Sequence, residues 1–301
     1  MSHDPTFYES FGRCIYCGDN SSKLSDEHIM PEALGGAHIL RNASCKTCGD
    51  ITSKFELDVC REMLGHFRYA HGGPGKKKRK KKRPSLITLP RAPGREPVTI
   101  PYEDYPAPAV LYRMGRAGFL QNAPSDLDLS GSWSLISLQD DARAEAFQKR
   151  FDHPLTATFK HAPQSFGRMI AKISYGQVLT TIGNDDFDAI CLPYILGTQP
   201  NISYIVGGVT TPLAPEDVGY RMQTSAFGTR TDMWLVATIR FFANLPTPEY
   251  HAVVGRVHGA HNVLRVANKL GGGQLAALSP ASAPHWAPAI GGARGFVDQN
   301  G

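Results

Sequence analysis

The sequence predicts an α+β protein in which a small cysteine-stapled unit of two strands and one helix precedes a larger α+β domain with a mainly antiparallel sheet. Two Cys-x-x-Cys pairs in the first 50 residues, a helical stripe after the second pair, and later segments rich in β-branched and aromatic residues support this. The chain has 301 residues, of which 42% are hydrophobic and 20% charged. It is long enough to bury a core, and its composition excludes a wholly disordered, collagen-like or coiled-coil protein.

Three zones differ in composition along the chain. Residues 1–72 hold the cysteine pairs, and residues 109–301 form a long remainder in which we find no motif that can be converted into chemistry. Between them, residues 73–108 contain Gly73, Pro74, a basic run and seven further prolines. Prolines at that density favour extended chain over packed elements, so we expect a linker there.

The first zone is predicted to fold as strand, strand, helix. Leu24 to Met30 and Ala37 to Ala43 are the expected strands, and the two glycines before Ala37 permit a tight reversal. After Lys46, apolar residues recur at every fourth position, which indicates one face of an amphipathic helix; these are Ile51, Phe55, Val59, Met63 and Phe67. Gly72, Gly73 and Pro74 are expected to end it.

The third zone mixes the two periods. Helices are expected over Phe166 to Ile182 and Asp185 to Leu196. Strands are expected at Trp133 to Leu138, Leu155 to Phe159, Ile202 to Val206, Trp234 to Phe242 and Tyr250 to Val257. From about residue 271 the chain is crowded with Gly, Pro and Ala, and we expect a loosely ordered tail.

The first residues lack a basic start followed by an apolar stretch, and no apolar run reaches the roughly 20 residues needed to cross a bilayer. We therefore expect a soluble, cytoplasmic protein without a membrane partner. The sequence does not reveal the oligomeric state.

The four clustered cysteines have the spacing of metal ligands. Cys14 and Cys17 form one pair, and Cys45 and Cys48 form the other. Each pair can present two sulfurs to one ion from a tight turn, and two such turns complete a tetrahedral zinc site. A disulfide or redox pair is the alternative, but a reducing compartment disfavours it. Four thiolates leave no position for a reacting water, so the zinc is expected to be structural and to be required for folding of the small unit.

Between the pairs, Asp26 and Glu27 directly precede His28 at the expected end of the first strand. A histidine flanked by acids is more often a solvated surface group, and the tripeptide alone is weak evidence. The framing is more informative: Cys-x-x-Cys, then Glu27-His28-Ile-x-Pro, then Gly-Gly, then a second Cys-x-x-Cys that leads into a helix.

In this order the motifs resemble the HNH endonuclease family, specifically its zinc-knuckle members with a ββα-metal core. The resemblance covers residues 14 to about 60. It implies a metal-dependent endonuclease that hydrolyses phosphodiester bonds of DNA, with His28 as general base and one catalytic Mg²⁺ or Mn²⁺ held by Glu27 and Asp50. His28 suits that role because its intrinsic pKa is near neutral, and carboxylates suit such ions.

The sequence departs from the family pattern at two places. The middle asparagine has no clean counterpart, since Asn42 lies closer to Cys45 than usual, and the final Asn or His falls on Gly49 and Asp50. The alternative function is therefore a zinc protein that binds nucleic acid at a degenerate HNH site without cleaving it. A third possibility makes the large C-terminal domain the principal actor. The target sequence, and DNA against RNA, stay open.

A run of basic residues follows the predicted helix. The chain has a formal charge of +5, and eight consecutive basic residues supply more than that: Lys76, Lys77, Lys78, Arg79, Lys80, Lys81, Lys82 and Arg83. Such a run favours a polyanion through counterion release, whereas the alternative is a solvated linker. Beside a nuclease module we expect it to bind nucleic acid without reading sequence, and Lys54 on the helix is a further candidate for binding phosphate.

Overall fold

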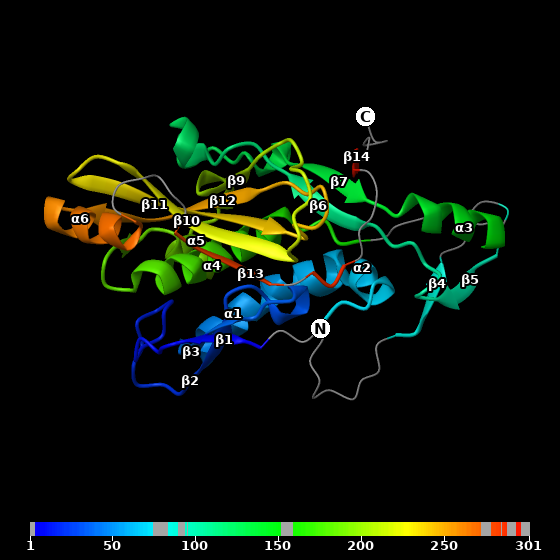
Figure 1. Cartoon of the computed structure of the whole chain (residues 1–301), viewed down its shortest axis with the longest axis horizontal. Helices are drawn as coiled ribbons and strands as arrows, with labels where there is room; N and C mark the ends of the chain where they lie inside the picture. Colours follow the sequence, from blue (N-terminus) through cyan, green and yellow to red (C-terminus); the bar gives the residue numbers. More distant parts are fainter. Residues whose placement is uncertain are drawn as a thin grey trace.

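The computed structural model describes residues 4–74, 84–89, 94, 96–151, 159–271, 278–283, 285–287 and 293–295. The basic run of residues 76–83 and most of the strand expected at residues 155–159 lie outside these ranges. The described residues form an α+β fold: a ββα module with a four-cysteine cluster, followed by a larger domain with an antiparallel six-stranded sheet (Figure 1).

The N-terminal module has the predicted order of elements. Strands β2 (Leu24–His28) and β3 (His38–Cys45) pair antiparallel, and the short strand β1 (Thr6–Tyr8) adds to β3 in parallel. Helix α1 (Lys46–Leu57) follows β3 directly. The helical path continues through a π-helical segment, η2 (Asp58–Met63), into α2 (Gly65–Ala70), so the predicted helix is confirmed in extent but is not one regular α-helix.

The predicted apolar stripe is the buried face of this helical stretch. Phe55, Val59, Met63 and Phe67 are each at most 4% exposed, whereas Ile51 is only partly buried. This face packs against the second domain, where helix α4 (Pro163–Ile182) contacts both α1 and η2.

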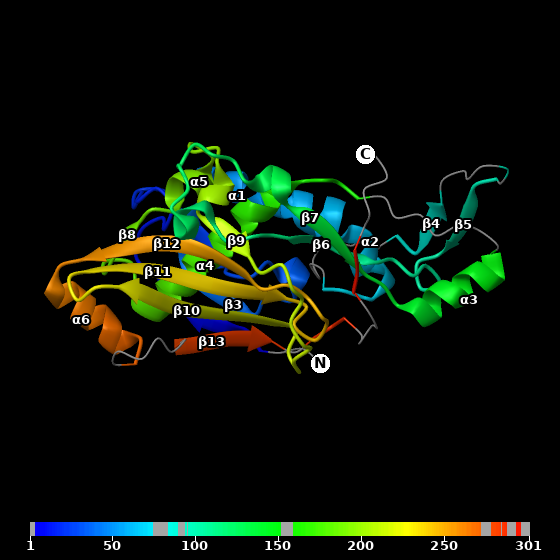
Figure 2. The ribbon, with the colours of Figure 1, turned by 90° about the horizontal axis from the view of Figure 1, so that it is seen from above.

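The larger domain is built on a sheet whose strand order is β13, β10, β11, β12, β8, with β9 also pairing with β12. Its long strands are successive antiparallel neighbours, and α4 crosses one face (Figure 2). The strands are β8 (Asp188–Ala189), β9 (Val206–Gly208), β10 (Tyr220–Gly228), β11 (Asp232–Phe241), β12 (Tyr250–His258) and β13 (Leu278–Ala283).

Smaller elements complete the chain. A second antiparallel sheet joins β6, β7 and β14, and β4 pairs with β5 beside α3 at one end of the molecule (Figures 1 and 2). Their bounds are β4 (Leu86–Leu89), β5 (Val98–Pro101), β6 (Ala109–Arg113), β7 (Ser134–Leu138), α3 (Asp141–Phe151), α5 (Leu192–Leu196), α6 (Ala260–Lys269) and β14 (Ala293–Gly295). Short 3₁₀ turns are η1 (Glu32–Leu34), η3 (Gly118–Gln121), η4 (Ser130–Ser132) and η5 (Ile202–Tyr204). No helix among the described residues is long and apolar enough to cross a membrane.

Three expectations for the larger domain need correction. The helix expected over residues 185–196 is helical only at Leu192–Leu196, because Asp188–Ala189 pairs with β12. The strand expected at residues 202–206 begins as a 3₁₀ turn and becomes extended only from Val206. The tail is not wholly loose, since Leu278–Ala283 forms the edge strand β13 against β10.

The two parts of the chain share one hydrophobic core. A single cluster of buried side chains runs from the cysteine cluster through α1 and η2 into α4 and the large sheet, whereas a second, smaller cluster lies around β4, β5 and α3. The domain boundaries predicted at residues 72 and 109 stay predictions. In the structure, α4 packs against α1 and η2 of the N-terminal module.

Candidate functional site: the cysteine cluster and the end of β2

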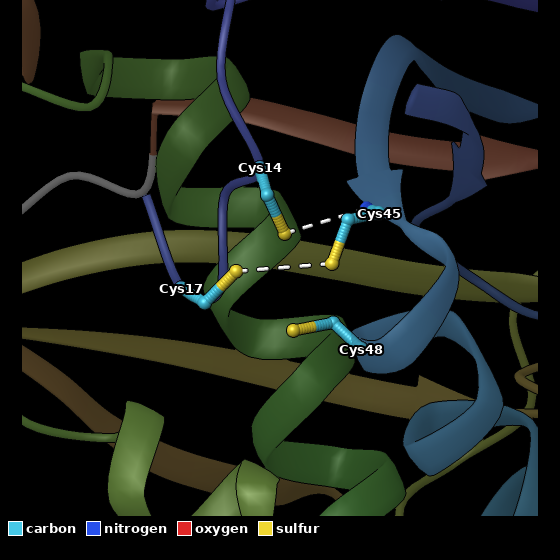
Figure 3. Close-up of side chains that lie close together, drawn as sticks. All are labelled: Cys14, Cys17, Cys45 and Cys48. Carbon is cyan, nitrogen blue, oxygen red and sulfur yellow. Dashed lines mark hydrogen bonds between the residues drawn. The ribbon is translucent and has the colours of Figure 1, made fainter. Parts of the chain in front are cut away.

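The four cysteines come together from two turns. Cys14 and Cys17 lie in the loop after β1, where Gly18 has a φ of +77° and donates a backbone hydrogen bond to Cys14 O. Cys45 ends β3, and Cys48 lies in the first turn of α1. The four sulfur atoms all lie within 4.8 Å of one another. Figure 3 shows the four side chains gathered between the loop and the start of the helix.

This donor set fits a zinc ion. Tetrahedral Zn–S bonds of about 2.3 Å place sulfurs roughly 3.8 Å apart, and Cys17 Sγ and Cys45 Sγ are 3.8 Å apart. The backbone N–H of Cys45 donates to Cys14 Sγ at 3.4 Å, as expected for a sulfur that carries negative charge. Burial and the neighbouring sulfurs raise the pKa of the Cys48 thiol. A bound cation would offset that by favouring the thiolate, so the cluster is consistent with structural zinc.

His28 lies at the end of β2, half-buried, where it pairs with Ile39 of β3. Its Nδ1 atom is buried and has no hydrogen-bond partner. A buried ring nitrogen without a partner is uncommon, because leaving such an atom unsatisfied costs about 1–3 kcal/mol. No described protein group therefore competes for the lone pair of Nδ1.

Glu27, the predicted metal ligand, has a cationic partner. The Nζ atom of Lys172, in the middle of α4, lies 2.7 Å from Glu27 Oε1 and 2.8 Å from Glu56 Oε1 on α1. The Lys172 side chain is only 1% exposed, compared with 12% for Glu27 and 25% for Glu56. Burial would lower the pKa of this ammonium, but the two carboxylates outweigh that effect and raise it above its ordinary value.

Asp50 lies in the first half of α1, whereas Glu56 lies near the end of that helix. The Asp50 carboxylate is 62% exposed and is paired with Lys46 Nζ, one helical turn earlier, at 2.5 Å. Among the described residues, the four cysteines are the only group of three or more His, Cys, Asp or Glu side chains close enough to share an ion. Glu27, His28 and Asp50 are not gathered into such a group, and each of the two carboxylates is paired with a lysine. Their binding of a divalent ion stays a prediction.

Asn42 serves a backbone function near this strand end. Its φ is +44°, and its N–H donates to Asp26 Oδ1 at 2.9 Å, next to the place where the register of β2 and β3 shifts. This irregularity in the β2–β3 pairing is thus held by the acid two residues before His28. Lys54 is exposed on α1, where its binding to phosphate stays a prediction, and the basic run from Lys76 to Arg83 lies outside the described residues.

Sequence reasoning missed Lys172 and Glu56. A signal for Lys172 existed, because it is a single cation in the apolar stretch Met169-Ile170-Ala171-Lys172-Ile173 of a predicted helix. A lysine on a buried helix face must find a counter-ion. Its partners could not be predicted, since they lie on β2 and α1, far away in sequence.

The large sheet also carries a cavity of about 1000 Å³, lined by Phe119, Tyr204, Phe227, Trp234 and His251 among others. Trp234, Val236 and Thr238 of β11 line it, whereas the alternate residues Leu235, Ala237 and Ile239 are fully buried. Successive side chains of a strand point to opposite faces. The cavity is therefore on the face of the sheet opposite the one that carries these buried residues.

The fold and the cluster together define a ββα module with four clustered cysteines, a donor set that is consistent with structural zinc. Residues 14–66 match the family described as HNH endonuclease, so the chain carries an HNH-family domain over these residues. No curated protein and no solved structure matches the chain.

Proposed function

We propose that the protein is an endonuclease that hydrolyses phosphodiester bonds of DNA, with His28 as the general base. The observation that carries this proposal is the buried, unpartnered Nδ1 of His28 at the end of β2, inside the segment that matches the HNH endonuclease family. An unprotonated imidazole at neutral pH can accept a proton from water.

The chemistry assigned to His28 is a single proton transfer. Nδ1 takes a proton from a water molecule while the water oxygen forms a bond to the phosphorus atom. The bond from phosphorus to the 3′ oxygen breaks, and that oxygen takes up a proton from solvent. The products on the family pattern are a 5′ phosphate and a 3′ hydroxyl.

The developing negative charge on the phosphate needs a nearby cation. The family resemblance offers one source, a Mg²⁺ or Mn²⁺ ion on Glu27 and Asp50, and this assignment stays a prediction. The ammonium of Lys172 is not a second source, because it is buried and already paired with the carboxylates of Glu27 and Glu56. The role of His28 as the base can be tested without identifying the cation.

The test is nicking of supercoiled plasmid by the zinc-loaded chain. We expect His28→Ala to lower the rate by about 100-fold or more, because a positioned general base contributes 10²–10⁴-fold. His261→Ala is the matched control, since His261 is an exposed histidine on α6. Nicking that survives in His28→Ala would remove the base from the mechanism.

The second candidate function is binding of nucleic acid without cleavage. It is favoured by one observation, the ion pairing of both predicted ligands with lysines of the chain. A gel-shift assay separates the two functions: a wild-type chain that retards DNA and leaves it uncut with Mg²⁺, with Mn²⁺ and without either ion supports binding alone.

A further inference from the structure

The surroundings of Lys172 resemble those of a bound cation. Four oxygen atoms approach Nζ: Glu27 Oε1 at 2.7 Å, Glu56 Oε1 at 2.8 Å, the carbonyl of His28, and the carbonyl of Ile29 at 3.4 Å. They come from β2, from the residue after it and from α1. A buried ammonium persists only when it is paired and hydrogen-bonded in this way, because the interior does not solvate it.

The position of Lys172 conflicts with a divalent ion on Glu27. A Mg²⁺ ion would bind a carboxylate oxygen at about 2.0–2.1 Å, beside an ammonium that already lies 2.7 Å from Oε1. Two cations so close repel each other more strongly where little water enters. Asp50, the other predicted ligand, is exposed and paired with Lys46, so it does not offset this repulsion.

The lysine is fixed in place by the packing of α4. One turn after Lys172, a Cβ at Gly176 would lie 3.1 Å from the side chain of Ile29, so the helix approaches the chain that follows β2 closely. Ile29 belongs to the core shared by the module and the larger domain, and the residues Ile29 and Lys172 are only 1% and 2% exposed. Withdrawal of the ammonium would therefore require separation of packed elements.

We infer that Lys172 is the resident cation of the HNH site: its ammonium occupies the position on Glu27 that the family resemblance gives to a divalent ion. Resting on the proposed function, this inference makes Lys172 a positioning residue, because its hydrogen bond to the carbonyl of His28 holds the backbone of the general base. Glu27 and Glu56 then serve as counter-ions of Lys172, and the site requires no divalent ion on Glu27.

The direct test measures Mn²⁺ binding by electron paramagnetic resonance, with the cysteines loaded with zinc. We expect the Mn²⁺ affinity of the wild-type chain to be unchanged in Glu27→Gln. One equivalent of bound Mn²⁺ whose affinity falls about tenfold or more in Glu27→Gln would overturn the inference, since ligand-shell changes have effects of that size. This comparison does not depend on any variant of Lys172.

A second measurement removes the ammonium. Lys172→Met leaves two facing carboxylates, so we expect its Mn²⁺ affinity to rise about tenfold or more over wild type. Lys46→Met is the matched control, because it removes an exposed lysine from Asp50, and we expect no such gain. An equal gain in the two variants would contradict a special position for Lys172. If Lys172→Met does not fold, the wild-type comparison still decides.

Cleavage provides a separate readout. Wild-type nicking in buffer freed of divalent ions, with zinc retained at the cysteines, is expected to change less than about threefold when Mg²⁺ is added. The inference would be overturned if wild-type nicking required added Mg²⁺ and Glu27→Gln abolished this Mg²⁺-stimulated nicking. Absence of nicking in every buffer would instead contradict the proposed function, and the Mn²⁺ titration would still report on Lys172.

Discussion

The ammonium of Lys172 and the carboxylate of Glu27 form an ion pair of 2.7 Å that joins the middle of α4 to the end of β2. One partner belongs to the HNH-family module and the other to the larger domain. The pair lies one residue from His28, so the candidate base depends for its position on a part of the chain that the module itself does not contain.

This pair predicts a large loss of stability when the lysine is removed. Lys172→Met leaves Glu27 and Glu56 facing each other without a counter-ion. Breaking a buried pair from one side costs about 3–5 kcal/mol. Because both carboxylates retain some exposure, we expect the lower end of that range in the free energy of unfolding, measured with urea.

Lys46→Met is the control for this measurement. It breaks the exposed pair with Asp50, where the two side chains are 84% and 62% exposed. Such pairs contribute about 0–1 kcal/mol. Equal effects of the two substitutions would show that the Lys172 pair is not buried in solution.

Metal removal should unfold the N-terminal module. The two cysteine turns hold β3 and α1 to the loop after β1, and without an ion the cluster loses its cross-link. We expect a chelator that strips zinc to lower the thermal midpoint of the whole chain, because the module shares its core with α4. Zinc content by mass spectrometry, followed with circular dichroism, checks this.

A single cysteine substitution refines the zinc test. Cys48→Ser should lower the zinc content, while Cys191→Ser should retain one zinc per chain, since Cys191 is buried away from the cluster. Full zinc content in Cys48→Ser would argue against a four-sulfur site.

The basic run of residues 76–83 is predicted to raise affinity for nucleic acid without reading sequence. Replacing Lys76, Lys77 and Lys78 by alanine should flatten the dependence of log K on log salt by about 0.9 for each phosphate of duplex DNA that the run no longer neutralises. A triple alanine variant at Lys23, Lys46 and Lys149, which are exposed lysines elsewhere, is the control. An unchanged slope in the first variant would assign the run to a solvated linker.

Local patterns in the sequence predicted much of the module. The spacing of the cysteine pairs, the glycines between the strands and the four-residue recurrence from Phe55 to Phe67 each depend on neighbours in the chain, and each is found as expected. The long helix α4 was predicted for the same reason, because its apolar residues repeat with the helical period.

Pairing between distant segments was the main source of error. A helix was expected over residues 185–196, yet Asp188–Ala189 pairs with β12, which lies more than 60 residues later. Strand β10 was missed although its residues alternate, since the buried Tyr220, Met222 and Thr224 are separated by polar residues. Its pairing with β11 and β13 depends on segments later in the chain.

The sequence by itself determined that four sulfurs would be presented in pairs, and that an acid and a histidine would end a strand between them. Only the tertiary structure decided what faces that acid. The periodicity of α4 indicates that position 172 is buried, but a buried charge is stabilised by whichever opposite charges the fold brings within reach. For Lys172 these are Glu27 and Glu56, and no local pattern specifies that meeting.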